Sequence, residues 1–142
     1  MKNIVLSTLL LICTGQVLAS QATGKSYEHY NLECTEKLKT DSDIVAKHFD
    51  ASHHLPAGNE ELTRVIECVG KESGLIFEDG TYNLPLLKNH VLRNLIPLVA
   101  EHTPKSEEIA DKVVGECKHQ TKGRDRIVSL HNCIVDAIRA SF

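Results

Sequence analysis

The chain has 142 residues, no tryptophan, three tyrosines, three phenylalanines and a formal net charge of −3. A mildly acidic chain without basic clusters or aromatic platforms is a poor candidate for binding nucleic acid. So few aromatic residues also argue against a large aromatic binding surface, and the length suits one domain around one core.

Residues 1–19 have the pattern of a secretory signal peptide. Lys2 precedes an apolar run, and Val17 and Ala19 occupy the −3 and −1 positions of a cleavage site before Ser20. The run is about 16 residues long and is interrupted by polar residues, whereas a membrane span needs roughly 20. We therefore expect a secreted, extracellular chain without membrane insertion. Residues 20–142 would form a single helical domain whose formal charge is −4, because Lys2 is the only charged residue of the leader.

Apolar residues recur at helical spacing along this domain, whereas alternation with a period of two rarely lasts beyond four residues, so the sequence predicts an all-α fold. Ser26 is expected to cap a first helix to about residue 39, and Asp41 or Ser42 to open a short second one. Asn59 would cap a third helix that ends near residue 74. Residues 75–83 contain an Asp-Gly turn signal and are expected to form a loop.

Residues 84–96 form the most apolar predicted helix, with an apolar stripe about half the circumference wide, so other helices must surround it. Pro97 lacks an N–H group and is expected to break or kink this helix. Thr103-Pro104 has the pattern of a helix start, and the fifth helix would run to about residue 120. Asp125 is expected to cap the sixth helix. The prediction is thus about six short helices.

Four cysteines follow the leader, and each lies in a predicted helix outside any C-x-x-C pair: Cys34, Cys68, Cys117 and Cys133. An even set of thiols in an oxidising compartment predicts two disulfides that join helix to helix. Four cysteines allow three pairings, and the sequence alone does not choose among them. Each bridge adds about 2–4 kcal/mol on an entropic model. A shell held covalently in this way can tolerate an incompletely packed interior.

Residues that could carry catalysis or bind a metal have simpler interpretations here. No two of the eight histidines have ligand spacing on one predicted helix, so surface or titrating roles are favoured over metal binding. Thiols in disulfides cannot act as nucleophiles. The carboxylate pairs Glu60-Glu61 and Glu107-Glu108 lie at helix starts, where the helix dipole explains them. We therefore expect neither catalysis nor a cofactor.

The apolar helix and its neighbours offer much more inward-facing aliphatic surface than polar groups. An apolar pocket with few polar anchors binds lipophilic molecules without reacting with them. Phe142 is a further candidate because it could plug one mouth of the cavity. The predicted lining residues are Phe49, Leu87, Val91, Leu95, Ile96, Val113, Val114, Val135 and Ile138.

Over essentially the whole mature chain, this pattern resembles the insect odorant-binding protein family, which comprises pheromone and general odorant binders. The resemblance rests on the leader, about 120 mature residues, six short helices and the spacing of the four cysteines. Glu78-Asp79-Gly80 and the stretch Leu130-His131-x-Cys133 also look family-like. Family members usually carry six cysteines, and Arg64 and Arg124 stand at the second and fifth positions here. The chain thus resembles the four-cysteine, or minus-C, subgroup.

This resemblance implies the pairs Cys34–Cys68 and Cys117–Cys133 around a central apolar cavity. It also implies a carrier of odorants, pheromones or similar lipophiles, with a membrane receptor as candidate partner, and we expect a monomer or weak dimer. If the alignment holds, the Cβ atoms of Arg64 and Arg124 should lie within about 10 Å. Their like charges would need solvent or carboxylates nearby, and Glu60 and Glu67 are spaced to relieve the charge of Arg64 within the helix. Only nine residues follow Cys133, so histidine protonation is favoured over a tail switch for any pH response.

A different class of function fits the same pattern. A secreted, disulfide-bonded helical protein of the cytokine, venom or saliva type would act on a protein partner. Such a protein would have a filled core and an exposed apolar patch, so a cavity distinguishes the two hypotheses.

Overall fold

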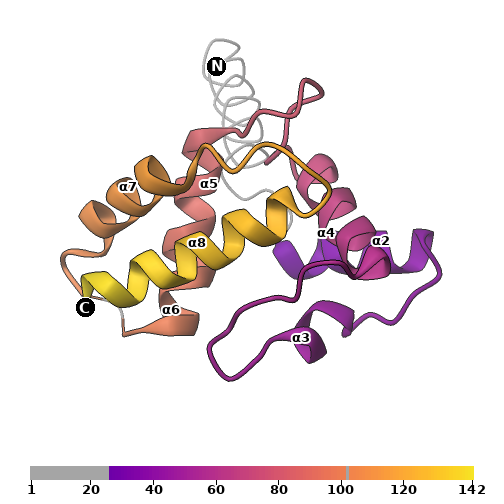
Figure 1. Cartoon of the computed structure of the whole chain (residues 1–142), viewed down its shortest axis with the longest axis horizontal. Coiled ribbons are helices and arrows are strands. Elements are labelled where there is room, and N and C mark those ends of the chain that lie inside the picture. The colour runs from indigo at the N-terminus through magenta and orange to yellow at the C-terminus, as the bar shows by residue number, and fades with distance from the viewer. Residues whose placement is uncertain (1–25, 102) are drawn as a thin grey trace, which may run out of the picture.

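The computed structural model describes residues 26–101 and 103–142, and these residues form an all-helical, disulfide-bonded fold (Figure 1). The predicted signal peptide and its cleavage site lie outside the described residues. The elements are α2 (Tyr27–Lys37), α3 (Ile44–His48), α4 (Glu60–Glu72), α5 (Leu84–His90), the π-helix η1 (Val91–Leu95), α6 (Ile96–Val99), α7 (Ser106–Cys117) and α8 (Arg126–Ser141). Since α5, η1 and α6 follow one another without a gap, the described residues contain six helical runs, as predicted.

The two capping residues predicted for the first and third helices are confirmed. Ser26 Oγ accepts a hydrogen bond from the His29 N–H at 3.2 Å, and Asn59 Oδ1 accepts one from the Leu62 N–H at 3.0 Å. Each bond satisfies an N–H group that has no partner within the first helical turn. The second helix differs slightly from the prediction, because α3 begins at Ile44 after Asp43, without a side-chain cap.

The helical run does not break at Pro97, and a kink there, the other predicted outcome, stays a prediction. Pro97 lies in the first turn of α6, and it has no N–H to donate to the turn before it. The preceding turn widens into the π-helix η1, in which the Ile96 N–H bonds to the Val91 carbonyl five residues earlier. A π-turn shifts the hydrogen-bond ladder and so accommodates a proline that would clash with a regular helix. The helical run ends only at Val99.

The fifth and sixth helices begin differently from their predictions. The Thr103 carbonyl accepts from the Ser106 N–H at 3.0 Å, so Thr103-Pro104 forms a turn before α7, which ends at Cys117 rather than near residue 120. Asp125 precedes α8, but its side chain makes no capping hydrogen bond. Its carboxylate instead accepts from the Gly58 N–H at 3.1 Å and the Thr63 hydroxyl at 3.2 Å, which ties α8 to α4.

The segment 75–83 is a loop, as predicted, closed by a single antiparallel bridge between Ile76 and Tyr82. Gly80 turns the chain with φ +86°, a conformation that glycine adopts without strain. Ile76 lies so close to Gly70 of α4 that a Cβ atom at Gly70 would stand 2.4 Å from its Cδ1 atom. The loop is therefore pressed against α4.

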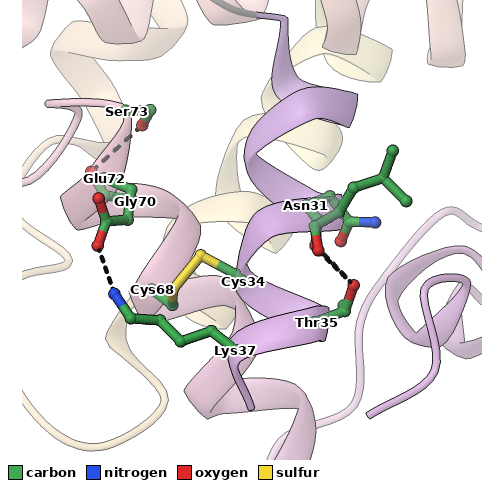
Figure 2. Close-up of a disulfide and its surroundings, with 9 residues drawn as sticks. Asn31, Cys34, Thr35, Lys37, Cys68, Gly70, Glu72 and Ser73 are labelled. Carbon is green, nitrogen blue, oxygen red and sulfur yellow. Dashed lines mark hydrogen bonds and ion pairs between the residues drawn. A yellow bond between two sulfur atoms is a disulfide. The ribbon is translucent and has the colours of Figure 1, made fainter. Parts of the chain in front are cut away.

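Both disulfides have the pairing that the resemblance implied. Cys34–Cys68 joins α2 to α4 with a Cα–Cα distance of 5.9 Å, and Cys117–Cys133 joins α7 to α8 at 5.8 Å. Figure 2 shows the first bridge beside the Lys37–Glu72 ion pair, which links the same two helices at 3.1 Å. The fold thus contains two covalently closed helix pairs.

The charge relief predicted within the third helix is wrong. Glu60 pairs with Arg124 at 3.2 Å and Glu67 with Arg126 at 3.1 Å, so these two carboxylates of α4 reach across to residues at or just before the start of α8. Arg64 and Arg124 are exposed to solvent. The proximity of their Cβ atoms stays a prediction.

Candidate ligand-binding cavity

A cavity of about 780 Å³ lies between the described helices, within the usual 300–1,000 Å³ of small-molecule sites. All helical elements except α7 contribute to the part of its wall that the structure describes. The cavity therefore lies between the α2–α4 pair, α8 and the α5–η1–α6 run, rather than around the centre of one helix.

The inner wall is aliphatic because the apolar faces of α4, α5, η1 and α8 meet there. Residues three or four positions apart share a helix face, and this spacing brings neighbouring side chains of α4 and of α8 to the same surface. The buried apolar residues at the inner wall include Ile66, Val69, Leu87, Leu95, Leu130 and Ile134. This part of the cavity suits a hydrocarbon chain or ring.

The opposite wall is polar and reaches the surface. Tyr27, Tyr30 and Asn31 of α2 line it, facing His90 and Asn94 of α5 and η1. The rings of Tyr27 and His90 lie 5.7 Å apart, so these two helices meet here. Tyr27 and Asn94 are partly exposed, which places an opening at this side. A bound molecule would thus meet polar groups near the surface and apolar groups inside.

Two histidines in the wall are neutral at neutral pH. Burial, together with repulsion from His131, lowers the pKa of His90 to about 4. Burial also lowers the pKa of His131. The His90 ring accepts from Asn94 Nδ2 at 3.0 Å, which places its single proton on Nε2. These rings therefore add polarity without charge, and Arg93 contributes a cation at the rim.

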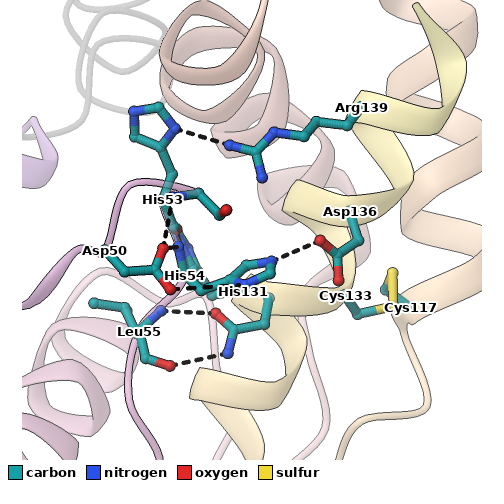
Figure 3. Close-up of polar contacts among 11 residues, drawn as sticks. Asp50, His53, His54, Leu55, Cys117, His131, Cys133, Asp136 and Arg139 are labelled. Carbon is teal, nitrogen blue, oxygen red and sulfur yellow. Dashed lines mark hydrogen bonds and ion pairs between the residues drawn. A yellow bond between two sulfur atoms is a disulfide. The ribbon is translucent and has the colours of Figure 1, made fainter.

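The loop that carries His53, His54 and Leu55 docks on α8 (Figure 3). The Asn132 side-chain amide bonds to both the N–H and the carbonyl of Leu55, each at 2.9 Å, and His54 Nε2 lies 2.6 Å from the Asp136 carboxylate. His131 Nε2 donates to the His53 carbonyl at 2.8 Å. These contacts hold Leu55 in the cavity wall, where the Phe49 ring lies 5.4 Å from the ring of His131.

The predicted lining residues separate into three groups. Phe49, Leu87 and Leu95 line the cavity. Phe142 lies at the surface, 51% exposed, and the structure places it outside the wall. The other predicted residues are buried in the packed core instead, and their contact with a ligand stays a prediction: Val91, Ile96, Val113, Val114, Val135 and Ile138.

Sequence reasoning missed the polar half of the wall. Tyr27, Tyr30 and Asn31 stand at i, i+3 and i+4, and His90 and Asn94 at i and i+4, so each set shares one helix face. That spacing was visible in the sequence. A search for apolar stripes passes over it because the residues are polar or aromatic.

The described residues contain no group of three or more His, Cys, Asp or Glu side chains arranged to hold a metal ion. None of the described helices is both long and apolar enough to span a bilayer.

Comparison with known proteins identifies the family. The model of the PBP/GOBP family, the pheromone-binding and general odorant-binding proteins of insects, matches residues 18–137, which is most of the chain. Comparisons with the curated proteins and with the solved structures give no match. Assignment to the four-cysteine subgroup stays a prediction. The helical fold, the two disulfides and the family match agree, and the chain belongs to the PBP/GOBP family of insect odorant-binding proteins.

Proposed function

We propose that this protein is a secreted, non-enzymatic carrier that binds a small lipophilic molecule, such as an odorant or pheromone, in the cavity. The observation that supports this most directly is a cavity of about 780 Å³ with an aliphatic inner wall and a polar opening. Such a wall stabilises a bound ligand because apolar ligand surface leaves water, which contributes about 25 cal/mol per Å² before the entropic costs of binding are subtracted.

The side chains of the wall support binding rather than catalysis. Catalysis by a nucleophile requires an activated hydroxyl, thiol or amine beside a base. The four cysteines after the leader are joined in disulfides, and the histidine rings at the wall contact Asn94 and the His53 carbonyl. The family is one of binding proteins.

The cavity also favours a carrier over a helical protein that acts on a protein partner, since that alternative requires a filled interior. The two disulfides suit an oxidising, extracellular compartment. Delivery to a membrane receptor, and a monomeric or weakly dimeric state, belong to the same proposal.

The absence of tryptophan provides a direct test. Phe49 lines the cavity, whereas Phe77 lies on the exposed side of the 75–83 loop. Each is replaced by tryptophan in turn, and the emission is followed while lipophilic alcohols, aldehydes and esters are added. The Phe49→Trp protein should respond saturably at micromolar concentrations, and the matched Phe77→Trp protein should not.

A third protein, Phe142→Trp, shows whether the C-terminal residue reaches the ligand. Equal responses at positions 49 and 77 would indicate non-specific adsorption. No saturable response in any folded variant, together with no displacement of a lipophilic dye from the unmodified protein, would contradict the carrier proposal.

A further inference from the structure

One side chain at the cavity wall has an unused hydrogen-bonding atom. Asn31 of α2 lines the cavity, and its Oδ1 atom is buried without a donor among the described residues. Buried polar atoms without a partner are rare, and each requires an explanation. Leaving such an acceptor unpaired is costly, because the atom has lost its hydrogen bonds to water.

The orientation of this amide is fixed by its other end. Asn31 Nδ2 lies 2.7 Å from the Ser42 carbonyl oxygen, which can only accept. The nitrogen must therefore face Ser42, and the oxygen must be the unpaired atom. Rotating the amide by 180° would set two acceptors against each other, so a flip does not resolve the deficit.

The backbone around Asn31 holds the side chain in place. The Thr35 hydroxyl donates to the Asn31 carbonyl at 2.8 Å, and the Cys34–Cys68 bridge fixes the next turn of α2 (Figure 2). The bond from Nδ2 to Ser42 ties the amide to the segment before α3. The acceptor is thus presented by a rigid support, as specificity requires.

We infer that the preferred ligand carries a hydroxyl group, which donates its hydrogen bond to Asn31 Oδ1 while its hydrocarbon part occupies the inner wall. The inference rests on the proposed carrier function and names the ligand class within it. Because Oδ1 is buried, a ligand reaches it only when the side chains that cover it move aside. A ligand that fills the cavity displaces them as it binds.

The chemistry of the acceptor separates ligand classes. Oδ1 can only accept, so aldehydes, esters and ethers, whose oxygens also only accept, leave it unpaired. The nearby tyrosine hydroxyls can both donate and accept, so they do not discriminate between these classes. Asn31 is therefore the specificity-determining residue at the polar side of the cavity.

The test uses three probes with the same number of non-hydrogen atoms: decanol, decanal and methyl nonyl ether. Each displaces a fluorescent lipophilic dye from the full mature protein. The unmodified protein should bind decanol about 10-fold more tightly than the other two, since one hydrogen bond and one buried acceptor are at stake. Asn31→Leu should reduce this preference to less than about twofold.

Two control variants isolate the acceptor. Asn31→Asp changes the contact with Ser42 but keeps an oxygen acceptor, so the preference for decanol should persist. Ser141→Ala removes a hydroxyl of α8 that does not line the cavity and that donates to the Ala137 carbonyl at 2.8 Å, and it should also leave the preference intact. If Asn31→Leu does not fold, the side-chain NH₂ signal of Asn31 in isotope-labelled protein should shift with decanol and not with the ether.

The outcomes separate the two proposals. Equal affinities of the unmodified protein for all three probes would overturn the hydroxyl inference and leave the carrier function standing. A decanol preference that survives Asn31→Leu would also overturn it, because the acceptor would then lie elsewhere. If none of the probes displaces the dye and the Phe49→Trp protein does not respond, the carrier function itself fails.

Discussion

Replacing Glu67 with glutamine is expected to destabilise the protein by about 2 kcal/mol, because it removes one charge from the ion pair that joins α4 to α8. Arg126 Nε and Nη2 each lie 3.1 Å from one oxygen of the Glu67 carboxylate, so the pair is bidentate. Arg126 Nη1 also donates to the Gly80 carbonyl at 3.2 Å. One guanidinium thus connects α8, α4 and the 75–83 loop.

The magnitude follows from the burial of this pair. The side chains of Arg126 and Glu67 are 16% and 24% exposed, which places them between surface and interior. Surface pairs contribute about 0–1 kcal/mol, and breaking a buried pair costs about 3–5 kcal/mol. Glutamine keeps the size and one acceptor but turns an NH₂ group toward the guanidinium, so we expect about 2 kcal/mol, or roughly 8 °C in Tm.

Glu60→Gln on the same helix is the matched control. Glu60 pairs with Arg124 at 3.2 Å, but these side chains are 68% and 86% exposed. Its replacement should change the free energy of unfolding by less than about 0.5 kcal/mol. Both variants keep both disulfides, so urea unfolding of the oxidised proteins compares them directly.

Equal losses in the two variants, or a loss below about 0.5 kcal/mol for Glu67→Gln, would refute the burial argument. Arg126→Met provides a second check, because it leaves the Glu67 carboxylate half-buried and unpaired. Adding Glu67→Gln to Arg126→Met should therefore recover part of the loss. Strict additivity would show that the two side chains are not coupled.

Three further predictions concern the interior and the bridges. Acidification should destabilise the protein, because burial lowers the pKa of His90 from an ordinary 6.5 to about 4. This shift contributes about 3 kcal/mol to the free energy of unfolding above pH 6.5, and the contribution is lost as pH falls toward 4. His90→Asn should flatten this dependence in urea unfolding, and an unchanged profile would count against it. Ile138→Ala should lower the free energy of unfolding by about 3–5 kcal/mol and Ile134→Ala by about 2 kcal/mol, because Ile134 borders an existing cavity and its truncation leaves less new void. Equal losses in denaturant unfolding would contradict this reasoning. Replacing Cys117 and Cys133 together by serine should lower the free energy of unfolding by about 3 kcal/mol, because the disulfide joins residues 16 positions apart in the sequence. An unchanged Tm would exclude this contribution of the bridge.

Helix positions and the fold class could be predicted because they depend on local signals. Ser26 and Asn59 are side-chain caps that act within three residues, so their roles follow from the sequence. Asp125 has the same chemistry but bonds to Gly58 and Thr63, more than 60 residues away in the sequence. The sequence also could not show that a π-turn would accommodate Pro97.

The cavity wall was harder to predict because burial alone does not distinguish core from cavity. Val91 and Leu95 are both buried and lie one turn apart, yet only Leu95 lines the cavity. The difference depends on how the α5–η1–α6 run is rotated about its own axis against α7 and α8, which is a tertiary property. Polar wall residues such as Asn31 lie outside the apolar stripes, which are the sequence signal of a lipophilic pocket.

The pattern of covalent links indicates how the cavity can adapt to ligands. Each disulfide lies within one helix pair, α2–α4 or α7–α8, and the cavity is bounded by the first pair, α8 and the α5–η1–α6 run. The contact between α4 and α8 depends on side-chain interactions, of which Glu67–Arg126 is the most buried ion pair. A change in cavity size therefore strains non-covalent contacts while both bridges stay intact. Glu67→Gln should therefore narrow the difference in affinity between long and short ligands, because separating α4 from α8 to fit a long ligand then requires less free energy.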